Sequence, residues 1–506
     1  MAIARYLVKK SVASIQKETE KGELHRSLSA LNLISLGIGC IIGTGIFVMT
    51  GQAAAQFAGP AIILSFLMTG FCCAFVALCY AELASMLPVS GSAYSYAYAS
   101  LGEFPAWFVG WLMLLEYGIA GSTVAVGWSG YLVSFLKDFH IMIPPEWIAA
   151  TGTHLVWVPG SEGWKELTEE LTKDLAAKHL MLATLPQATA IFNLPAALGL
   201  MGVTALLVMG VKESATVNNI IVFIKVTVII LFIAFGAFYI DPANWHPFLP
   251  ENTGEYGHFG PSGLMRGAGY IFFAYVGFEA VSTAAQEAKN PQRDIPIGII
   301  GSLAICTVLY ILVSLVLTGI VKYSTLNVPD PIAVAVDAIH LPWLAFTVKI
   351  GAICGLSSVM LVLMYGQTRI FYTMAHDGLL PPVFAKVHPK FKTPWVNTIM
   401  VGIIAAVVAG MTPIEALGDL VNLGTLIAFT IICFTVMYLR RKAPEMERPF
   451  KVPAPMITPI MGMLSCAALI STLWATFVAL IPYFLLGFAI YFGYSQFHSK
   501  LHPKNI

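Results

Sequence analysis

The chain has 506 residues, of which 58% are hydrophobic and only 11% are charged, and its mean hydropathy is +0.78. About a quarter of the residues of a soluble domain are charged, so this composition excludes an ordinary soluble protein. The net charge of +1 comes without a basic face or arm and argues against a nucleic-acid partner. Apolar runs of the roughly 20 residues that a spanning helix needs recur throughout, which predicts an all-α polytopic protein embedded in a lipid bilayer.

The chain begins with a polar segment, residues 1–29, that contains several Lys and Arg residues. The apolar segment after it is longer than the core of a cleavable signal peptide, so we expect it to remain as the first of twelve transmembrane helices. The predicted spans are 30–57, 61–86, 104–136, 194–210, 216–239, 262–287, 295–321, 343–374, 395–411, 414–439, 456–477 and 479–496. An even number of spans places both termini on one side of the membrane.

The distribution of basic residues indicates which side that is. Most of the 28 Lys and Arg fall on the side of the termini, including those at 440–442 and in the loop after the eighth span. Cytoplasmic loops carry an excess of Lys and Arg. We therefore expect a multi-pass plasma-membrane protein, located in the inner membrane of a bacterium, with a cytoplasmic segment 1–29 and a cytoplasmic tail 498–506.

The loop at about 137–193 is the only sizeable soluble insertion and is predicted to be extracellular. Within it, Trp164, Leu167, Leu171 and Leu175 have helical spacing, which predicts a short surface helix. All eight cysteines of the chain lie in apolar segments. This placement favours packing over disulfides or metal ligands, and we expect no metal site.

The first span contains LGIGCIIGTGIFVMTG, residues 36–51, in which glycines interrupt an apolar helix. Small residues commonly serve close helix packing. A second interrupted span, the sixth, carries Gly277 and then Glu279 in mid-membrane. Paired interruptions in corresponding spans predict a transporter with an inverted repeat, in which spans one to five are mirrored by spans six to ten. The predicted boundaries are 30–240 for the first repeat, 262–440 for the second and 455–497 for helices 11 and 12.

A break in the first span would suit an amino acid. Unwinding at Gly43, Thr44 and Gly45 would free backbone N–H groups at the start of a half-helix, where the helix dipole favours a carboxylate. The carbonyl groups of Ile41 and Ile42 end the other half-helix and can accept from an ammonium group. Glycine suits such a position because it lets the backbone turn sharply and a ligand approach closely.

A set of motifs along the chain points to a known family. They are LGIGCIIGTGIFVMTG, SGSAYSYAYASLGE, WLMLLEYGIA, GVKESATVNN, FFAYVGFEAVSTAAQEAKNPQRDIPIGI and MYGQTRIFYTMAHDGLLPPVFAKVHP. Together they resemble the amino acid, polyamine and organocation (APC) transporters, and within them the cationic amino acid transporter branch and its bacterial relatives. The resemblance covers nearly the whole chain. It implies a LeuT-like 5+5 inverted repeat with two extra C-terminal helices and broken helices 1 and 6.

Lys225 stands alone in the apolar fifth span and should face the protein interior. The resemblance implies that a lysine here takes the place of the cation of sodium-coupled relatives, so that proton binding replaces sodium. A fixed positive charge would also repel Na⁺, so no sodium is expected. The alternative is a permanently charged Lys225 that holds the first break by hydrogen bonds to its carbonyl groups.

Two acids lie within spans, Glu116 in the third and Glu279 in the sixth. Each could act in binding or proton transfer, or could pair internally and satisfy exposed backbone. Phe273, Ala274 and Val276, beside the second break, are candidates for the substrate pocket. The resemblance implies that Phe273 closes over the substrate and that the nearby backbone helps to bind its amine.

The resemblance also places Leu363 of the eighth span near the pocket. A leucine makes the cavity smaller and offers no acceptor for a guanidinium group. We therefore expect transport of small neutral L-amino acids such as alanine, while Glu116 and Glu279 keep a cationic substrate, arginine or lysine, as an alternative. Exchange against an internal amino acid remains an alternative to proton symport.

Other protein classes are disfavoured. An intramembrane enzyme would need a catalytic dyad or zinc ligands within the spans, but the histidines fall in predicted loops or span ends and no HExxH motif occurs. A channel would show rings contributed by several subunits. We expect a non-enzymatic transporter without a cofactor, driven by a proton gradient. An accessory membrane subunit, as some relatives have, is left open.

Overall fold

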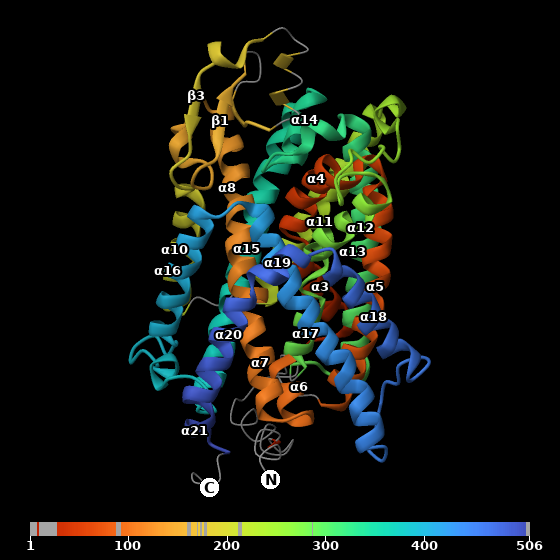
Figure 1. Ribbon diagram of the computed structural model, residues 1–506, viewed down its shortest axis with the longest axis vertical. Coiled ribbons are helices and arrows are strands. Elements are labelled where there is room, and N and C mark those ends of the chain that lie inside the picture. The colour runs from red at the N-terminus through yellow and green to blue at the C-terminus, as the bar shows by residue number, and fades with distance from the viewer. Residues whose placement is uncertain are drawn as a thin grey trace.

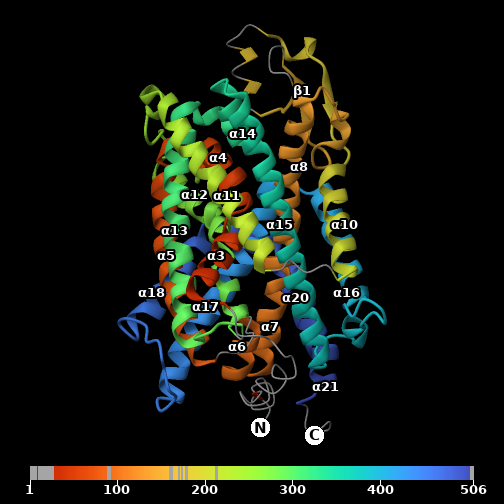
Figure 2. The same cartoon turned by 180° about the vertical axis from the view of Figure 1, so that it is seen from behind.

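The computed structural model describes residues 8–9, 28–87, 93–158, 163–168, 171–172, 175–176, 180–210, 215–285 and 287–501. The predicted cytoplasmic segment 1–29 and tail 498–506 lie largely outside these ranges. Long helices run side by side in one bundle, and three short strands lie at one end of it (Figures 1 and 2). We call this end the sheet end; α21 marks the opposite end.

The first part of the chain forms the first three predicted spans. Its helices are α3 (Ala30–Ile41), η1 (Gly45–Met49), α4 (Thr50–Ala53), η2 (Ala54–Ala58), η3 (Gly59–Ala61), α5 (Ile62–Met86), α6 (Ala93–Ser100), α7 (Glu103–Met113), η4 (Leu114–Ile119) and α8 (Ala120–Asp138). Ser29 begins α3 as an N-cap, in a capping box with Asn32. η1, η2 and η4 are π-helical segments inside longer helices, a feature that is frequent at functional sites.

The loop after α8 is not the simple helix that its spacing predicts. It forms an antiparallel sheet in the order β2-β1-β3, from β1 (His154–Trp157), β2 (Trp164–Glu166) and β3 (Gln187–Thr189), with η5 (Pro145–Trp147) and η6 (Leu182–Thr184) beside it. Trp164 therefore lies in a strand, opposite Trp157. Leu175, in a helical turn, packs in a small apolar cluster with Val156 and Val158. Backbone pairing with β1 overrides the local spacing at Trp164.

The rest of the chain supplies the remaining helices. They are α10 (Leu194–Val208), α11 (Ala215–Gly236), η7 (Ala237–Tyr239), η8 (Pro242–Trp245), α12 (Gly260–Ile271), η9 (Phe272–Tyr275), η10 (Phe278–Ala284), α13 (Pro291–Ile320), η11 (Tyr323–Leu326), α14 (Pro331–Ala338), α15 (Pro342–His376), η12 (Pro382–Ala385), α16 (Trp395–Met411), α17 (Ile414–Lys442), α18 (Ile457–Ser471), α19 (Trp474–Ala479), α20 (Ile481–Ile490), η13 (Tyr491–Ser495) and α21 (Gln496–His498). The short helix α14 is an element that the sequence analysis did not predict.

Apolar helices within the described residues confirm a multi-pass helical membrane protein. Seven are long and apolar enough to cross a membrane, and four more apolar helices are shorter. Described helices overlap each of the twelve predicted ranges. The exact number of crossings and the inverted repeat stay predictions.

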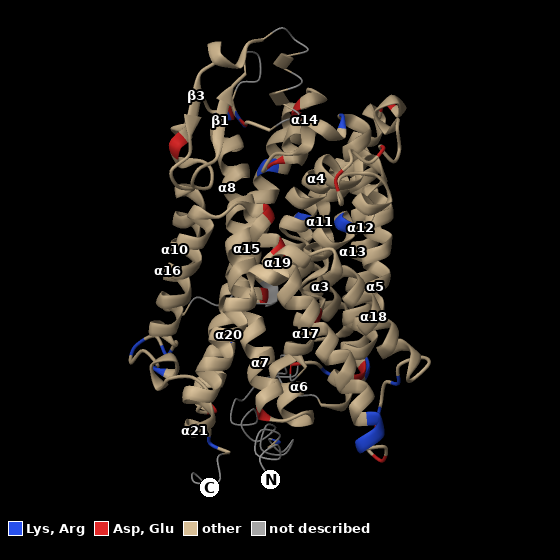
Figure 3. Cartoon of the chain, in the orientation of Figure 1, with Lys and Arg blue, Asp and Glu red and all other residues tan. Residues whose placement is uncertain are grey.

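The broken helices lie inside the bundle. The helix α3 packs against α11, α13 and η10, whereas α8 packs against α15 and α10 against α16. Figure 3 shows few charged residues in the middle of the bundle, and Lys and Arg gather mainly at the end opposite the strands. None of the eight cysteines forms a disulfide bond. The charged groups that remain in the middle therefore need partners inside the protein.

Candidate functional site

The first break lies at Ile42 and Gly43, so it overlaps the predicted unwinding at Gly43, Thr44 and Gly45 only at Gly43. The helix α3 ends at Ile41, Ile42 and Gly43 form a bend, and helical structure resumes at Thr44. Ile42 has an extended ψ of 96°, and its N–H still donates to the Ile38 carbonyl at 2.9 Å. The next helix starts at Thr44, and the Gly43 carbonyl before it accepts from the Phe47 N–H at 3.3 Å. The N–H groups that precede this bond lie at a helix start, the position that suits an anion.

The second break separates η9 from η10 at Val276 and Gly277. Val276 has φ −59° and ψ 129°, and Gly277 has φ 123°, a conformation that only glycine adopts readily. A Cβ atom at Gly277 would also lie 2.9 Å from the carbonyl carbon of Cys40. Both the conformation and the space at this position therefore require glycine.

The two breaks are in direct backbone contact. A Cβ atom at Gly45 would lie 2.3 Å from Ala274 Cα, and Gly277 faces Cys40. Farther along, Gly37 contacts Val281. Residue numbers rise on one helix as they fall on the other, so the two broken helices run antiparallel across the middle of the bundle. This arrangement brings Ile41, Ile42, Gly43, Thr44 and Gly45 together with Ala274 and its neighbours Phe273 and Val276.

Lys225 of α11 is fully buried and holds the first break. Its Nζ donates to the carbonyl oxygens of Gly39 at 3.0 Å and Ile42 at 3.3 Å. The side-chain stem lies against Gly355 of α15, where a Cβ atom would come 3.0 Å from the lysine Cγ. The sequence predicts that the Ile42 carbonyl accepts from the ammonium group of a substrate, but here it accepts from the ammonium group of Lys225. Such contacts fit both the coupling role of Lys225 and the alternative of a fixed structural charge.

Tyr310 of α13 joins the two breaks, and the sequence analysis did not single it out. Its hydroxyl lies 3.0 Å from the Ile41 carbonyl oxygen and 2.5 Å from that of Ala274. The residue is fully buried. Tyrosine on an apolar helix gives no local signal of such a role, because both acceptors come from distant parts of the chain.

The structure brings Glu116 and Glu279 together. Glu116 lies in the π-helical segment η4 and Glu279 lies in η10, and the two carboxyl groups are near enough to interact electrostatically. Neither carboxyl oxygen of Glu116 has a hydrogen-bond partner among the described residues. Both side chains are buried, with exposed fractions of 1% and 4%. Glu279 Oε2 also accepts from the Gly277 N–H at 2.9 Å. Glu279 therefore satisfies the broken backbone, and Glu116 lies near it as a second buried acid.

The remaining pocket candidates differ in their distance from the breaks. The Thr44 hydroxyl is buried without a hydrogen-bond partner among the described residues and lies near Gly127 of α8. On α15, the side chain that contacts Gly43 is Val359, with its Cγ atoms 3.4 and 3.5 Å from the position of a Cβ. Leu363 lies one turn farther along and is half-buried. Val359 is thus a site residue that the sequence analysis missed.

An ion pair joins α12 to α17 on the side of the site that is nearer the sheet end. Arg266 of α12 binds Asp419 of α17 in a bidentate manner, at 3.0 and 2.7 Å. The guanidinium group also lies 4.9 Å from the ring centre of Phe57 in η2, and Tyr270 donates to Gln52 at 2.9 Å. These contacts link the sheet-end halves of both broken helices to α17.

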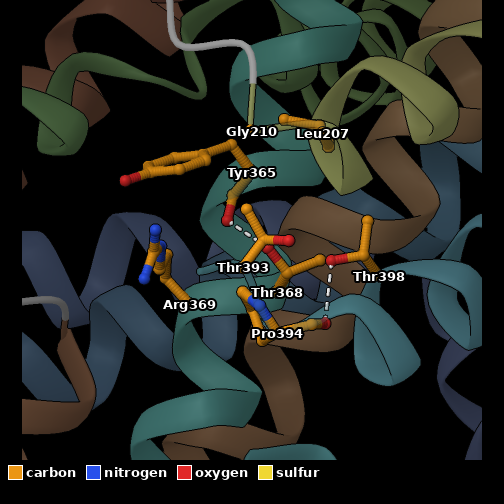
Figure 4. A pocket seen from close by; sticks show the side chains of 8 residues that line it. All are labelled: Leu207, Gly210, Tyr365, Thr368, Arg369, Thr393, Pro394 and Thr398. Atoms are coloured by element: carbon orange, nitrogen blue, oxygen red, sulfur yellow. Dashed lines mark hydrogen bonds between the residues drawn. The ribbon is translucent and has the colours of Figure 1, made fainter. Parts of the chain in front are cut away.

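A separate hollow lies between α10, α15 and α16 (Figure 4). It is lined by Leu207, Gly210, Tyr365, Thr368, Arg369, Thr393, Pro394 and Thr398. Its threonine hydroxyls all donate to nearby backbone carbonyls. The Thr368 hydroxyl donates to the Tyr365 carbonyl, and the Thr398 hydroxyl donates to the Pro394 carbonyl. None of the predicted site residues lines it, so this hollow is distinct from the breaks.

Comparison with known proteins gives consistent matches. A family model described as amino acid permease matches residues 28–494. A methylthioribose transporter and a branched-chain amino acid permease, both of Bacillus subtilis, are 45% and 43% identical to the chain, each over 98% of both proteins. A vacuolar cationic amino acid transporter of Arabidopsis thaliana is 37% identical over 84% of this chain and 64% of its own length.

Proposed function

Because this chain belongs to the amino acid permease family, we propose that it imports amino acids across the plasma membrane by alternating access, coupled to proton entry. The proposed substrates are small neutral L-amino acids such as alanine. The observation that carries the proposal is the contact between the two helix breaks, which brings backbone groups outside the regular helical pattern together in the middle of an apolar bundle. Irregular backbone at that depth is tolerated only beside a cavity or within protein.

The two ends of an amino acid fit this backbone by charge. The carboxylate accepts from the N–H groups at the start of the helix at Gly43, Thr44 and Gly45. The ammonium group donates to the carbonyl groups of Ile41 and Ala274, since each carbonyl oxygen has a second lone pair beside the one used by Tyr310. Phe273 and Val276 supply apolar contacts.

The proton is proposed to act at Lys225. As an ammonium ion, Lys225 binds the Gly39 and Ile42 carbonyls more strongly than a neutral amine does, since hydrogen bonds from charged donors are about twice as strong. Loss of the proton therefore loosens the first break. Glu116 and Glu279 lie close together beside the second break, and we propose that they support Lys225 by taking up and releasing protons during the transport cycle.

Side-chain selectivity is proposed to come from α15 and α8. Val359 contacts Gly43, and a Cβ at Gly127 would come 3.0 Å from Thr44 Cγ2, so the surroundings of the first break are apolar and tight. Leu363 adds a second apolar side chain one turn away. This favours alanine over arginine, which would need an acceptor for its guanidinium group. The names of the relatives suggest two further substrates to test, branched-chain amino acids and methylthioribose.

Uptake into proteoliposomes tests the proposal. We would measure labelled L-alanine uptake without sodium, with and without an inward proton gradient, and with unlabelled alanine, leucine, arginine or methylthioribose as competitor. We expect stimulation by the gradient and competition by alanine but not by arginine. Uptake that does not change with the proton gradient but requires an amino acid inside the proteoliposomes would identify an exchanger instead. No saturable uptake of labelled alanine, with or without the gradient, would refute the proposed substrate.

The proposed cellular arrangement follows the charge distribution. Both termini would lie in the cytoplasm and the sheet end would face outward, since Lys and Arg gather mainly at the opposite end (Figure 3). No cofactor and no sodium ion are part of the proposal. The amino acid and the proton are the partners, and an accessory subunit is not required.

A further inference from the structure

We infer that Tyr310 is a positioning residue for the ammonium subsite, because its hydroxyl fixes the two carbonyl groups to which the substrate amine donates. This inference rests on the proposed function and deepens it. It assigns a specific task to a side chain of α13, a helix that carries none of the residues predicted from the sequence for the site. The hydroxyl of Tyr310 lies between the two breaks.

The hydroxyl contacts both breaks at once. It lies 3.0 Å from the oxygen of Ile41, the last residue of α3, and 2.5 Å from that of Ala274 in η9. Both carbonyls end helical segments whose continuation is broken, so the intrahelical partners they would otherwise have are lost. Tyr310 is thus placed to satisfy two orphan acceptors that belong to different halves of the chain.

Neighbouring rings hold the phenol in place. Phe66 and Tyr275 lie with ring centroids 5.2 and 5.4 Å from that of Tyr310. Tyr275 in turn donates to the Phe66 carbonyl at 2.9 Å, which fixes the relative position of these two rings. A ring with two torsion angles in such a setting has little freedom to follow a moving carbonyl. Tyr310 therefore sets the position of the carbonyls and does not simply adapt to them.

The chemistry of the hydroxyl makes the arrangement sensitive to its loss. A phenol has one proton, which the two carbonyl oxygens share, and each oxygen keeps a lone pair for a further donor. Without the hydroxyl, two buried carbonyl dipoles would face each other with no donor between them, and leaving buried acceptors unmatched is costly. The substrate ammonium would then have to bring the carbonyls together itself, and this cost would appear as weaker binding.

Tyr131 of α8 provides a matched control. It is also fully buried, and its hydroxyl donates to the Phe47 carbonyl at 2.7 Å. That carbonyl belongs to the same broken helix but lies in its sheet-end half, and it is neither of the two carbonyls that Tyr310 binds. Replacing Tyr131 with Phe therefore removes the same group from the same helix without altering the proposed ammonium subsite.

The test compares alanine binding to the full-length wild-type protein, Tyr310→Phe and Tyr131→Phe. The dissociation constant would be measured in detergent from the rise in melting temperature with alanine concentration. We expect Tyr310→Phe to weaken alanine binding by roughly tenfold, which is about the contribution of one hydrogen bond that involves a charged group. We expect Tyr131→Phe to weaken it by less than about twofold. Both variants should melt at a lower temperature than the wild type.

Equal dissociation constants for all three proteins, or an equal loss in both variants, would overturn the inference. If the wild-type protein does not bind alanine, the result contradicts the proposed function, and the inference about Tyr310 is refuted together with it. Should Tyr310→Phe not fold, para-methylphenylalanine and para-aminophenylalanine at position 310 would replace it. These side chains have nearly the same shape, and only the amino form can donate, so only that form should bind alanine as tightly as the wild type.

Discussion

At the scale of single residues, the site depends on a few buried polar groups whose partners are backbone atoms. Lys225 and Tyr310 each bind two carbonyl groups, and Glu279 accepts from the Gly277 N–H. An unmatched buried polar group costs roughly 1–3 kcal/mol, so these side chains stabilise the two breaks as well as any function they perform. Substitutions must therefore separate a loss of folding from a loss of coupling.

Lys225→Met is expected to abolish the response of alanine uptake to a proton gradient while alanine exchange continues at a reduced rate. The substitution removes the ammonium group that binds the Gly39 and Ile42 carbonyls but keeps a long apolar stem. Both activities would be measured in the same proteoliposomes. Lys349→Met is the matched control, since Lys349 is a buried lysine of α15 that binds Asp138 and Asp337 away from the breaks.

The control should lower the melting temperature but keep the gradient response. If Lys225→Met loses exchange and uptake together, while still folded, Lys225 is a fixed structural charge. If it keeps the gradient response, the proton acts elsewhere, and the Glu116 and Glu279 pair becomes the first place to look.

Gly277→Ala is expected to reduce alanine uptake by roughly tenfold or more. A residue other than glycine at φ 123° costs about 1–3 kcal/mol, and its Cβ would press on Cys40 at the point where the breaks meet. Gly202→Ala in α10 is the control, because nothing lies within 4 Å of a Cβ there. Wild-type uptake by the Gly277 variant would show that the second break tolerates rearrangement.

At the scale of elements, helices far apart in sequence are joined by ion pairs at both ends of the bundle. Arg266 and Asp419 join α12 to α17 near the sheet end. Toward the opposite end, Glu82 of α5 accepts from Arg440 at the end of α17 and from the Val452 N–H. The first pair fixes a broken helix against α17 and the second fixes α5 against α17, whereas apolar surfaces alone would let these helices slide past one another.

We expect Arg266→Gln and Asp419→Asn each to lower the melting temperature, and the double variant to lower it by less than the sum of the two. The side chains are only 15% and 11% exposed, so each single change leaves a poorly solvated charge without its partner. A double-mutant cycle should give a coupling energy of about 0.5–3 kcal/mol. Strictly additive changes would mean that the pair contributes little beyond its separate contacts.

At the scale of the whole molecule, membrane orientation can be tested directly. Met181, with an exposed fraction of 74%, lies in the loop that carries the sheet, and Lys390 is exposed in the loop after α15. In intact cells, a membrane-impermeant thiol reagent should label Met181→Cys but label Lys390→Cys only after the membrane is opened. The opposite pattern would invert the proposed topology, and labelling of both in intact cells would refute the assignment of opposite sides. The wild-type protein serves as the control, because seven of its eight thiols are buried or half-buried.

The class of the protein and the approximate positions of its helices and of both breaks follow from the amino-acid sequence. These features depend on local properties: an apolar run long enough for a membrane, a glycine where φ must be positive, an isolated lysine that lipid would not accept. The short strands after α8 were not predicted, because pairing of β1 with β2 and β3 depends on segments that are not adjacent in the chain.

Which side chains meet in the site depends on the tertiary structure. It placed Tyr310 between two carbonyls from different halves of the chain, set Glu116 near Glu279, joined Arg266 to Asp419 and brought Val359 to Gly43. Each of these contacts joins residues from separate helices, and a helical pattern says which face is apolar but not which neighbour it meets. The chemistry of the site therefore depends on the packing of helices that the sequence identifies only one at a time.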